Sequence, residues 1–416
     1  MAWRAGGVGR QCDSEGQSVM SPLQHIKVVE ATTMITGPLA GMLLADLGAE
    51  VVKLENPNGG DPFRTFRGKD HSPHFLSYNR NKKSIALDIR SDQGKDVLFR
   101  LIRQADVFIE NFRPGVMERL GIGRAVLMKE NPRLVYCAIS GFGSTGPYKD
   151  RPAYDAVAQA LAGTSSLFFH GDPVITGPSL SDNLTGMYAC YGILAALVER
   201  SKTGRAQTVD VNMLEATMAF MPDPFLAHTM LGVVAEPLMR SRASQSYALR
   251  CSDGKLLSIH MSSQEKFWLA VIEAFGAQKL ASDPRFNSRA GRVDNYLELA
   301  QELQNVAATA PRDHWMKRLH AKDVPHAPVN SLPEVMADPQ VRHLGSFHEM
   351  HHPAGGSYQA IRRPVYFDGS RDDQPLALPP NLNADGEQIL RGLGYDDTEI
   401  ESWRKHNATT VKNAAS

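Results

Sequence analysis

The sequence predicts an α/β fold with two domains, a large domain built on a parallel sheet and a smaller α+β domain after it. Short β-branched runs alternate with helix-length apolar segments from residue 25 to about residue 220. Pro222, Pro224 and Pro237 then interrupt this alternation, and a hairpin-like strand with a long helix follows them. A chain of 416 residues is also long for a single compact core, which favours two domains.

The first strand–helix–strand unit carries the clearest signal. HIKVVEAT at 25–32 predicts a strand, GPLAGMLLADLG at 37–48 an apolar helix that ends at Gly48, and AEVVKLE at 49–55 a second strand. The pattern continues with expected strands at 84–89, 107–110, 134–140 and near Val209, and expected helices at 92–104, 156–162 and 185–200. This spacing is typical of a parallel sheet with helices on both faces.

The chain divides into four parts. We expect a disordered leader at 1–20, a large α/β domain at 21–225, a small α+β domain at 226–330 and a tail at 331–416. The leader has no apolar core and contains Asp13 and Glu15, so a disordered leader, or an upstream start before Met20, is favoured over a cleaved targeting signal.

Composition excludes several classes of function. Because 45 basic residues balance 45 acidic ones, no net charge would attract nucleic acid or an anionic membrane, and we expect neither as a partner. The longest apolar run, from Met187 to Val198, is shorter than the roughly 18–20 residues of a membrane span. The four cysteines form no C-x-x-C pair and the histidines no H-E-x-x-H pattern, so we expect no disulfide framework, no metal site and a reducing, cytoplasmic setting.

Segments that follow the strands are the candidate binding loops, because parallel sheets bind ligands beyond the carboxyl ends of their strands. Three segments offer polar or backbone groups: the turn at Ile35 and Thr36, the loop that begins at Asn56, and the segment with Asn111, Phe112 and Arg119. A fourth candidate, the basic cluster that contains Lys83, comes just before a strand. Tight turns, helix caps and solvated lysines explain the same residues without a ligand.

Two aspartates follow the expected helix at 156–162. Asp172 lies in a Gly-Asp-Pro turn and Asp182 precedes the expected helix at 185–200. A surface turn and a helix cap are the ordinary interpretations of these positions.

Taken together, the segments resemble the family III CoA-transferases, the CaiB/BaiF family of the formyl-CoA transferase type. The matching strings run in the family order: TGPLAGMLLADLGAEVVKLENPNGGDPFR, NRNKKSIALD, ADVFIENFRPGVMERLG, GFGSTGPY, YDAVAQALAG, GDPVITGPSLSDNLTG, KTGRAQTVDV, DPRF, VPHAPVN and ILRGLGYDDTEI. The resemblance extends from Val28 to about Trp403.

The resemblance implies a Rossmann-like sheet domain that binds no dinucleotide, a tail that returns to the large domain, and a homodimer whose subunits interlock. It implies coenzyme A or acyl-CoA as a substrate, with no tightly bound cofactor and no metal. The positions that match the CoA contacts of the family are Ile35, Thr36, Asn56, Lys83, Asn111, Phe112 and Arg119.

The reaction implied by the resemblance moves CoA from an acyl-CoA, with succinyl-CoA as one candidate, to a free carboxylic acid through an aspartate. A carboxylate is already ionised at neutral pH and needs no general base to attack a thioester. Counted back from Asp182, the spacing typical of the family falls on His170, and a loop two residues shorter moves it to Asp172. We therefore assign the nucleophile to Asp172, with Asp182 as the alternative.

One segment bears on the substrate, and two alternative functions stay open. His260 to Gln264 replaces a glycine run of members that act on the smallest acids, which argues against formyl-CoA and oxalate as substrates. An α-methylacyl-CoA racemase would carry histidine where this chain has Tyr154, before Asp155. A non-catalytic CoA-binding protein would keep the fold without a nucleophile.

Overall fold

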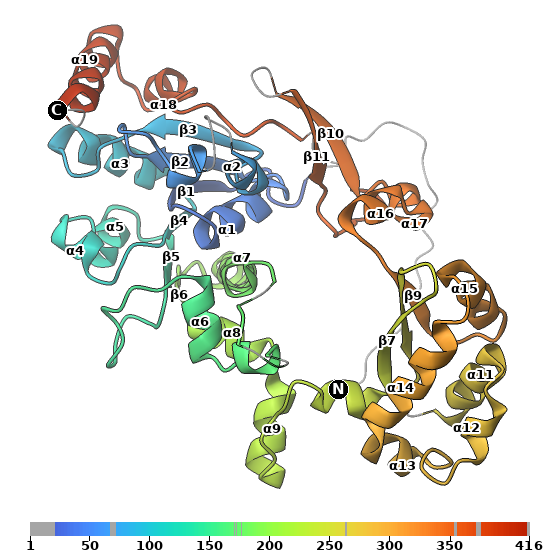
Figure 1. Ribbon diagram of the computed structural model, residues 1–416. Helices are drawn as coiled ribbons and strands as arrows, with labels where there is room; N and C mark the ends of the chain where they lie inside the picture. Colours follow the sequence, from blue (N-terminus) through green and yellow to red (C-terminus); the bar gives the residue numbers. More distant parts are fainter. Residues whose placement is uncertain are drawn as a thin grey trace, which may run out of the picture.

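A computed structural model describes residues 21–66, 72–169, 171, 173–175, 177–262, 264–352, 356–371 and 376–413, and side-chain surroundings up to residue 405. The leader at 1–20 and Asp172 lie outside the described residues. Figure 1 shows a large domain, a small domain and two separate connections between them.

The large domain is built on a six-stranded parallel sheet in the order β3-β2-β1-β4-β5-β6. Its strands are β1 (Lys27–Ala31), β2 (Glu50–Glu55), β3 (Lys82–Ala86), β4 (Val107–Glu110), β5 (Val135–Ser140) and β6 (Thr208–Asn212). The order reverses between β1 and β4, because β2 and β3 extend the sheet on one side of β1 and β4 to β6 on the other. The expected α/β fold class is confirmed.

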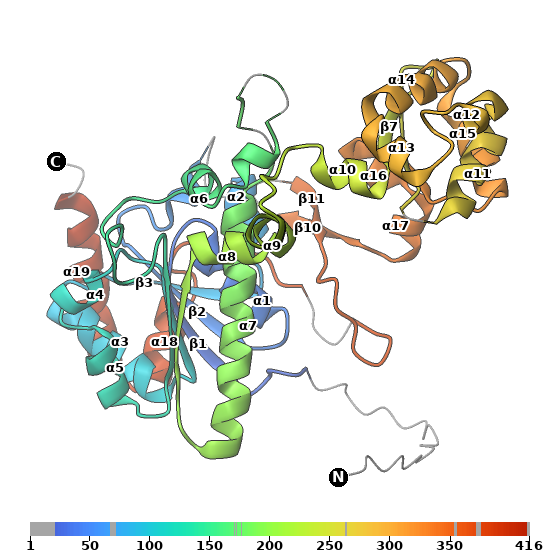
Figure 2. The same cartoon turned by 90° about the horizontal axis from the view of Figure 1, so that it is seen from below.

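Alternating side chains of the strands feed two hydrophobic cores, one on each face of the sheet. Val28 packs with α1 (Thr36–Ala45) and α7 (Leu180–Thr203), whereas its neighbour Val29 packs with α3 (Asp92–Gln104) and α5 (Arg124–Glu130) on the opposite face. Figure 2 shows the sheet between these two helical layers. Both faces are therefore covered, as a parallel sheet requires.

The C-terminal segment lies on the large domain. Helices α18 (Gly386–Gly392) and α19 (Asp397–Asn413) add Leu390 and Trp403 to the core beside α3. Asp385 Oδ2 accepts the backbone N–H of Ser84 at 2.8 Å, and Asn383 Oδ1 accepts that of Ala86 at 3.0 Å. These bonds occupy donors of the edge strand β3 that would otherwise lack a partner strand.

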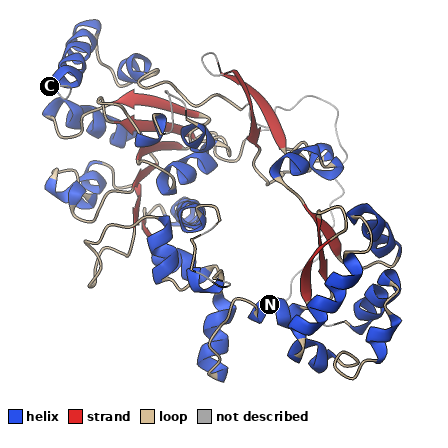
Figure 3. Ribbon diagram, in the orientation of Figure 1, coloured by secondary structure: helices blue, strands red, loops and turns tan. Residues whose placement is uncertain are grey.

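The small domain combines an antiparallel sheet with a helical layer (Figure 3). Its strands lie in the order β7 (Ser246–Arg250), β8 (Leu256–His260) and β9 (His326–Val329). The core is formed with Trp268, Phe275 and Trp315. The helices are α11 (Glu265–Phe275), α12 (Gln278–Ser282), α13 (Arg289–Asp294), α14 (Tyr296–Ala307) and α15 (Arg312–Ala321).

Two connections link the domains and lie apart in Figure 1. The first leaves the large domain through α8 (Met213–Ala219), α9 (Pro222–Leu231) and α10 (Met239–Ser244). The second returns through α16 (Leu332–Ala337), α17 (Pro339–His343) and the hairpin of β10 (Phe347–His352) and β11 (Gly356–Ile361). The shorter helices of the large domain are η1 (Pro62–Arg64), α2 (Pro73–Tyr78), α4 (Val116–Arg119), α6 (Asp155–Leu161) and η2 (Ser165–Leu167).

A fully buried ion network lies under the carboxyl ends of β1 and β2. Lys53 Nζ is 2.9 Å from Glu30 Oε1 and 3.1 Å from Asp61 Oδ2, and Lys82 Nζ is 2.8 Å from Glu30 Oε2. Burial alone would raise the pKa of Glu30, but Lys53 and Lys82 outweigh it and hold that pKa below its usual value. A β-carbon at Gly41 would lie 1.9 Å from Glu30 Oε2, so only glycine fits there.

We predict that Lys53→Met destabilises the protein by about 3–5 kcal/mol, because it leaves two buried carboxylates without their shared cation. Lys83→Met is the matched control: Lys83 pairs with Glu50 at 2.6 Å on a half-exposed surface, where the loss should be below about 1 kcal/mol. Chemical denaturation of both variants measures the difference. Equal destabilisation of the two variants would contradict the proposed contribution of the buried network to the free energy of unfolding.

Candidate active site

The site lies at the carboxyl edge of the sheet, where the strand order reverses between β1 and β4. The loops after β1, β4 and β5 surround a cavity of about 240 Å³ at this point. Its wall includes Thr33 to Thr36, Asn111 to Pro114, Ser140, Tyr154 and Asp182. Open parallel sheets bind ligands at such a reversal because two neighbouring loops diverge there and leave a crevice.

The turn after β1 is held rigidly by its neighbours. Asn111 accepts the N–H of Thr33 at 3.1 Å and donates to the Thr33 carbonyl at 2.9 Å and to Thr36 Oγ1 at 3.1 Å. Met34 adopts a left-handed conformation with φ 69°, and its N–H points to both carboxylate oxygens of Asp61 at 3.3 Å. A non-glycine residue in this conformation is strained, and the surrounding hydrogen bonds maintain it.

A second cavity of about 400 Å³ lies beyond the ends of β1, β2 and β3. Apolar side chains such as Leu54, Leu87 and Ile89 form most of its wall, with Asn56 and Arg90 among the polar residues. This combination suits a flat, partly apolar group that carries a few hydrogen-bonding atoms.

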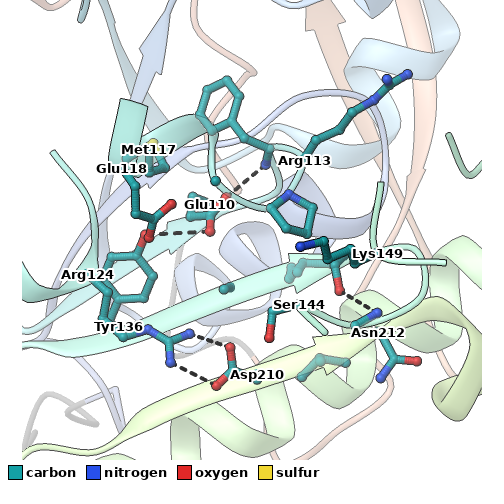
Figure 4. Close-up of a pocket in the computed structure, with 18 of the residues that line it drawn as sticks. Glu110, Arg113, Met117, Glu118, Arg124, Tyr136, Ser144, Lys149, Asp210 and Asn212 are labelled. Atoms are coloured by element: carbon teal, nitrogen blue, oxygen red, sulfur yellow. Dashed lines mark hydrogen bonds and ion pairs between the residues drawn. The ribbon is translucent and has the colours of Figure 1, made fainter. Parts of the chain in front are cut away.

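A third cavity of about 520 Å³ lies beside β4, β5 and β6 (Figure 4). Its wall contains four cations, Arg113, Arg119, Arg124 and Lys149, and four carboxylates, Glu110, Glu118, Asp150 and Asp210. Arg124 is engaged by Asp210 of β6. Phe112 lines this cavity and both of the others.

Asp182, which lines the smallest cavity, lies beside a second carboxylate, that of Asp155. Asp182 lies in the first turn of α7, and its backbone N–H donates to Asp155 Oδ1 at 3.1 Å. Asp155 Oδ2 accepts Gln159 Nε2 at 2.6 Å. Burial, with a further contribution from Asp155, raises the pKa of Asp182 to about 7. Ionisation of Asp182 is therefore finely balanced near neutral pH.

Six of the seven predicted CoA-contact residues come together at this edge of the sheet. The smallest cavity contains Ile35, Thr36, Asn111 and Phe112, the second contains Asn56 and the third contains Arg119. Their contact with a ligand stays a prediction. Asp172 lies outside the described residues, whereas its alternative Asp182 lines the smallest cavity.

Lys83 lies apart from the other six. It stands near the start of β3 and pairs with Glu50 at the start of β2, so it belongs to the amino edge of the sheet. The first residues of parallel strands lie at the edge opposite to the loops that follow those strands, so Lys83 is separated from the other six residues. Its contact with CoA stays a prediction. Its neighbour Lys82 is fully buried and bonded to Glu30.

Sequence reasoning missed several cations of the cavities, among them Arg90 and Lys149. Arg90 follows the end of β3, and Lys149 directly follows the GFGSTGPY segment after β5. Both positions could have been found from the rule that groups after parallel strands share one edge.

Comparison with known proteins identifies the family. The model of CoA-transferase family III matches residues 23–386. The chain belongs to CoA-transferase family III. Formyl-CoA:oxalate CoA-transferase of Escherichia coli O6:H1 is 31% identical to it, with 93% of this chain and 99% of that protein covered.

Solved structures agree with this family. A CaiB/BaiF family protein from Brucella suis is 31% identical with a TM-score of 0.79, covering 90% of this chain and 100% of that one. Rv3272 from Mycobacterium tuberculosis gives the same identity and TM-score, covering 89% of this chain and 99% of that one. This family III CoA-transferase is thus an enzyme whose substrates are CoA thioesters and acids.

The described residues contain no group of three or more His, Cys, Asp or Glu side chains arranged to hold a metal ion. None of the helices in this part of the chain has both the length and the apolar character of a membrane span.

We predict that Asp182→Asn stabilises the enzyme at pH 8 by on the order of 2–4 kcal/mol. Because the folded pKa is raised, the folded state binds the proton more tightly, and stability falls as pH rises from about 4 to about 7. The gain in the variant should therefore disappear towards pH 4. Thermal unfolding at several pH values measures it, with Asp92→Asn, an exposed first-turn aspartate of α3, as control. A pH-independent difference would contradict the assignment.

Proposed function

We propose that this family III CoA-transferase moves CoA from an acyl-CoA donor to a free carboxylic acid through a covalent aspartyl intermediate. The observation that carries the proposal is the half-buried carboxylate of Asp182 in the cavity formed by the turn after β1 and the loop after β4. Both are segments for which the sequence predicts CoA contacts.

The three cavities supply a path for the whole CoA molecule. In our proposal the adenine lies in the cavity of Asn56 and Arg90, and the phosphates lie near Arg113, Arg119 and Lys149. Guanidinium groups bind phosphate oxygens in a bidentate manner. The pantetheine arm then passes Phe112 and brings the thioester to the smallest cavity.

The chemistry begins when a carboxylate oxygen of the aspartate attacks the thioester carbon. The C–S bond breaks, CoA leaves as a thiolate, and an aspartyl–acyl anhydride remains. The thiolate then attacks the aspartyl carbonyl, which expels the donor acid as a carboxylate and leaves an aspartyl-CoA thioester.

The second half of the reaction repeats these steps with the acceptor. The acceptor carboxylate attacks the aspartyl-CoA thioester and expels the thiolate, which gives a second anhydride. Attack of the thiolate on the acceptor's acyl carbon releases the new acyl-CoA and regenerates the aspartate. Each anhydride keeps the acyl group activated, so the reaction requires no other energy source.

Two aspartates compete for the role of nucleophile. Asp182 is supported by its position in the smallest cavity and by its raised pKa, which makes the ionised form more basic and hence more nucleophilic. Asp172 is supported by the family resemblance in its segment. We propose Asp182, and keep Asp172 as the alternative that the experiment must exclude.

The identity of the donor and acceptor acids is a separate part of the proposal. The relatives named formyl-CoA:oxalate CoA-transferase favour small acids, whereas the segment from His260 to Gln264 favours larger ones, with succinyl-CoA as one donor. A panel that crosses formyl-, acetyl- and succinyl-CoA with oxalate, succinate and glutarate separates these possibilities by mass spectrometry of the CoA products.

We predict that Asp182→Ala lowers kcat by at least about 10³-fold and abolishes trapping of an aspartyl hydroxamate by hydroxylamine. Asp172→Ala, the matched variant, should retain the hydroxamate at Asp182. Peptide mass spectrometry of protein incubated with acyl-CoA locates the modified residue. The reverse result would assign the nucleophile to Asp172, and no modification in the active wild type would contradict the covalent mechanism.

We also propose a homodimer. Apolar side chains are exposed on α7, at Met187 and Tyr191, and on α9, at Leu226, Met230 and Leu231. Such patches are typical of protein interfaces. The two separate connections between the domains are compatible with subunits that interlock.

We predict a mass in solution twice that of one chain, measured by light scattering at micromolar concentration. Replacing Leu226 and Met230 with aspartate should shift the protein to monomer, because charges would have to be desolvated in an apolar interface. A monomeric wild type, or a double variant that stays dimeric, would contradict this interface.

A further inference from the structure

Glu110 is a buried carboxylate that accepts a hydrogen bond from the backbone of the loop that directly follows its strand. It is the last residue of β4 and is 8% exposed. Its Oε2 accepts the N–H of Phe112 at 2.8 Å, and the hydroxyl of Tyr136 lies 3.5 Å from its Oε1 (Figure 4). Among the described residues no cation forms an ion pair with it, and Arg124, which faces it, is paired with Asp210.

A buried carboxylate without an ion-pair partner is costly, and among the described residues hydrogen bonds and the more distant charge of Arg124 offset this cost. Glu55, the equivalent last residue of β2, shows the usual solution: it accepts Arg64 Nε at 2.8 Å and Nη2 at 2.6 Å. Within the described part of the chain, the strand end at Glu110 has no such ion pair. Its closest hydrogen-bond partner is instead the backbone N–H of Phe112 at 2.8 Å.

Phe112 is the residue through which Glu110 can affect the site. Phe112 is a lining residue of all three cavities, of about 240, 400 and 520 Å³. The preceding residue, Asn111, bonds to the turn after β1 on its other side. The loop after β4 is thus fixed at two adjacent residues, by Asn111 to the turn at Thr33 and by Glu110 to the end of its own strand.

We infer that Glu110 is a positioning residue for acyl-CoA binding, which holds the Phe112 backbone so that the three cavities form one path for the pantetheine arm. The inference rests on the proposed function, because it assumes that CoA occupies these cavities. Glu110 itself contacts no reacting atom in this proposal. Its loss therefore weakens CoA binding more than it slows the chemical step.

Because Glu110 titrates near neutral pH, its hydrogen bond to Phe112 should depend on pH. Burial raises its pKa to about 7, Glu118 of α4 adds to the rise, and the Phe112 N–H and Arg124 oppose it. The other charged or titratable groups that face this cavity are Arg113, Arg119, Tyr136, Lys149, Asp150 and Asp210. A protonated carboxyl accepts a hydrogen bond less strongly, so the hold on Phe112 weakens as pH falls through about 7.

The experiment compares Glu110→Leu with Glu110→Gln. Leucine removes the acceptor, so the Kd for free CoA and the KM for acyl-CoA should rise about tenfold, with kcat changed less than about threefold. Glutamine keeps an acceptor oxygen without titrating. Its KM should stay within about twofold of wild type at pH 8, and the rise in KM that wild type shows between pH 8 and pH 6 should be reduced. Calorimetry with CoA and initial rates with the active donor provide the readouts.

Glu118→Gln is the matched control, because it removes a negative charge from the same cavity without touching Phe112. An equal effect of Glu118→Gln and Glu110→Leu would assign the result to charge alone and overturn the inference. Unchanged CoA affinity in Glu110→Leu would overturn it too. If the leucine variant does not fold, the pH profile of Glu110→Gln decides, and a profile identical to wild type overturns the inference. Wild type that binds no CoA would instead refute the proposed function.

Discussion

The buried lysine Lys53 fixes the geometry on which the site depends. Besides its two carboxylate partners it donates to the Thr32 carbonyl at 2.8 Å, so one ammonium group joins the end of β1, the interior of β2 and the loop at Asp61. Asp61 in turn receives the N–H of Met34, the strained residue of the turn after β1. A fully desolvated ammonium tolerates few arrangements of its acceptors, and the turn is held in place as a consequence.

The large domain contains two kinds of carboxylate removed from solvent. Glu30 and Glu55 are matched by cations, which outweigh the effect of burial and lower their pKa values. Glu110, which is buried, and Asp182, which is half-buried, form no ion pair with a described residue, and burial raises their pKa values to about 7. The ion pairs of Glu30 and Glu55 hold the edge of the sheet in one conformation. Glu110 and Asp182 instead place titratable groups at the cavities. Perturbed carboxylates of this second kind are typical of functional sites.

The sheet and most of its connections could be predicted because their signals are local. The β-branched runs, the Ser91 cap and the glycine at position 48 each act within one element, and the structure confirms a parallel sheet from them. The cations were harder to place. Lys82 is buried beside Glu30, Lys83 lies at the amino edge, and Arg90 and Lys149 line cavities, although all four are ordinary basic residues in the sequence.

The sequence by itself determined the alternation of strands and helices, the family, and the loops that carry polar groups, because each depends on neighbours along the chain. Only the tertiary structure decided which carboxylates of the described residues form ion pairs, that Lys53 pairs with two of them, and that Phe112 lines three cavities. Those properties depend on burial and on distances between strands far apart in sequence. The free energy of a charge depends on its surroundings in space, which one-dimensional order does not specify.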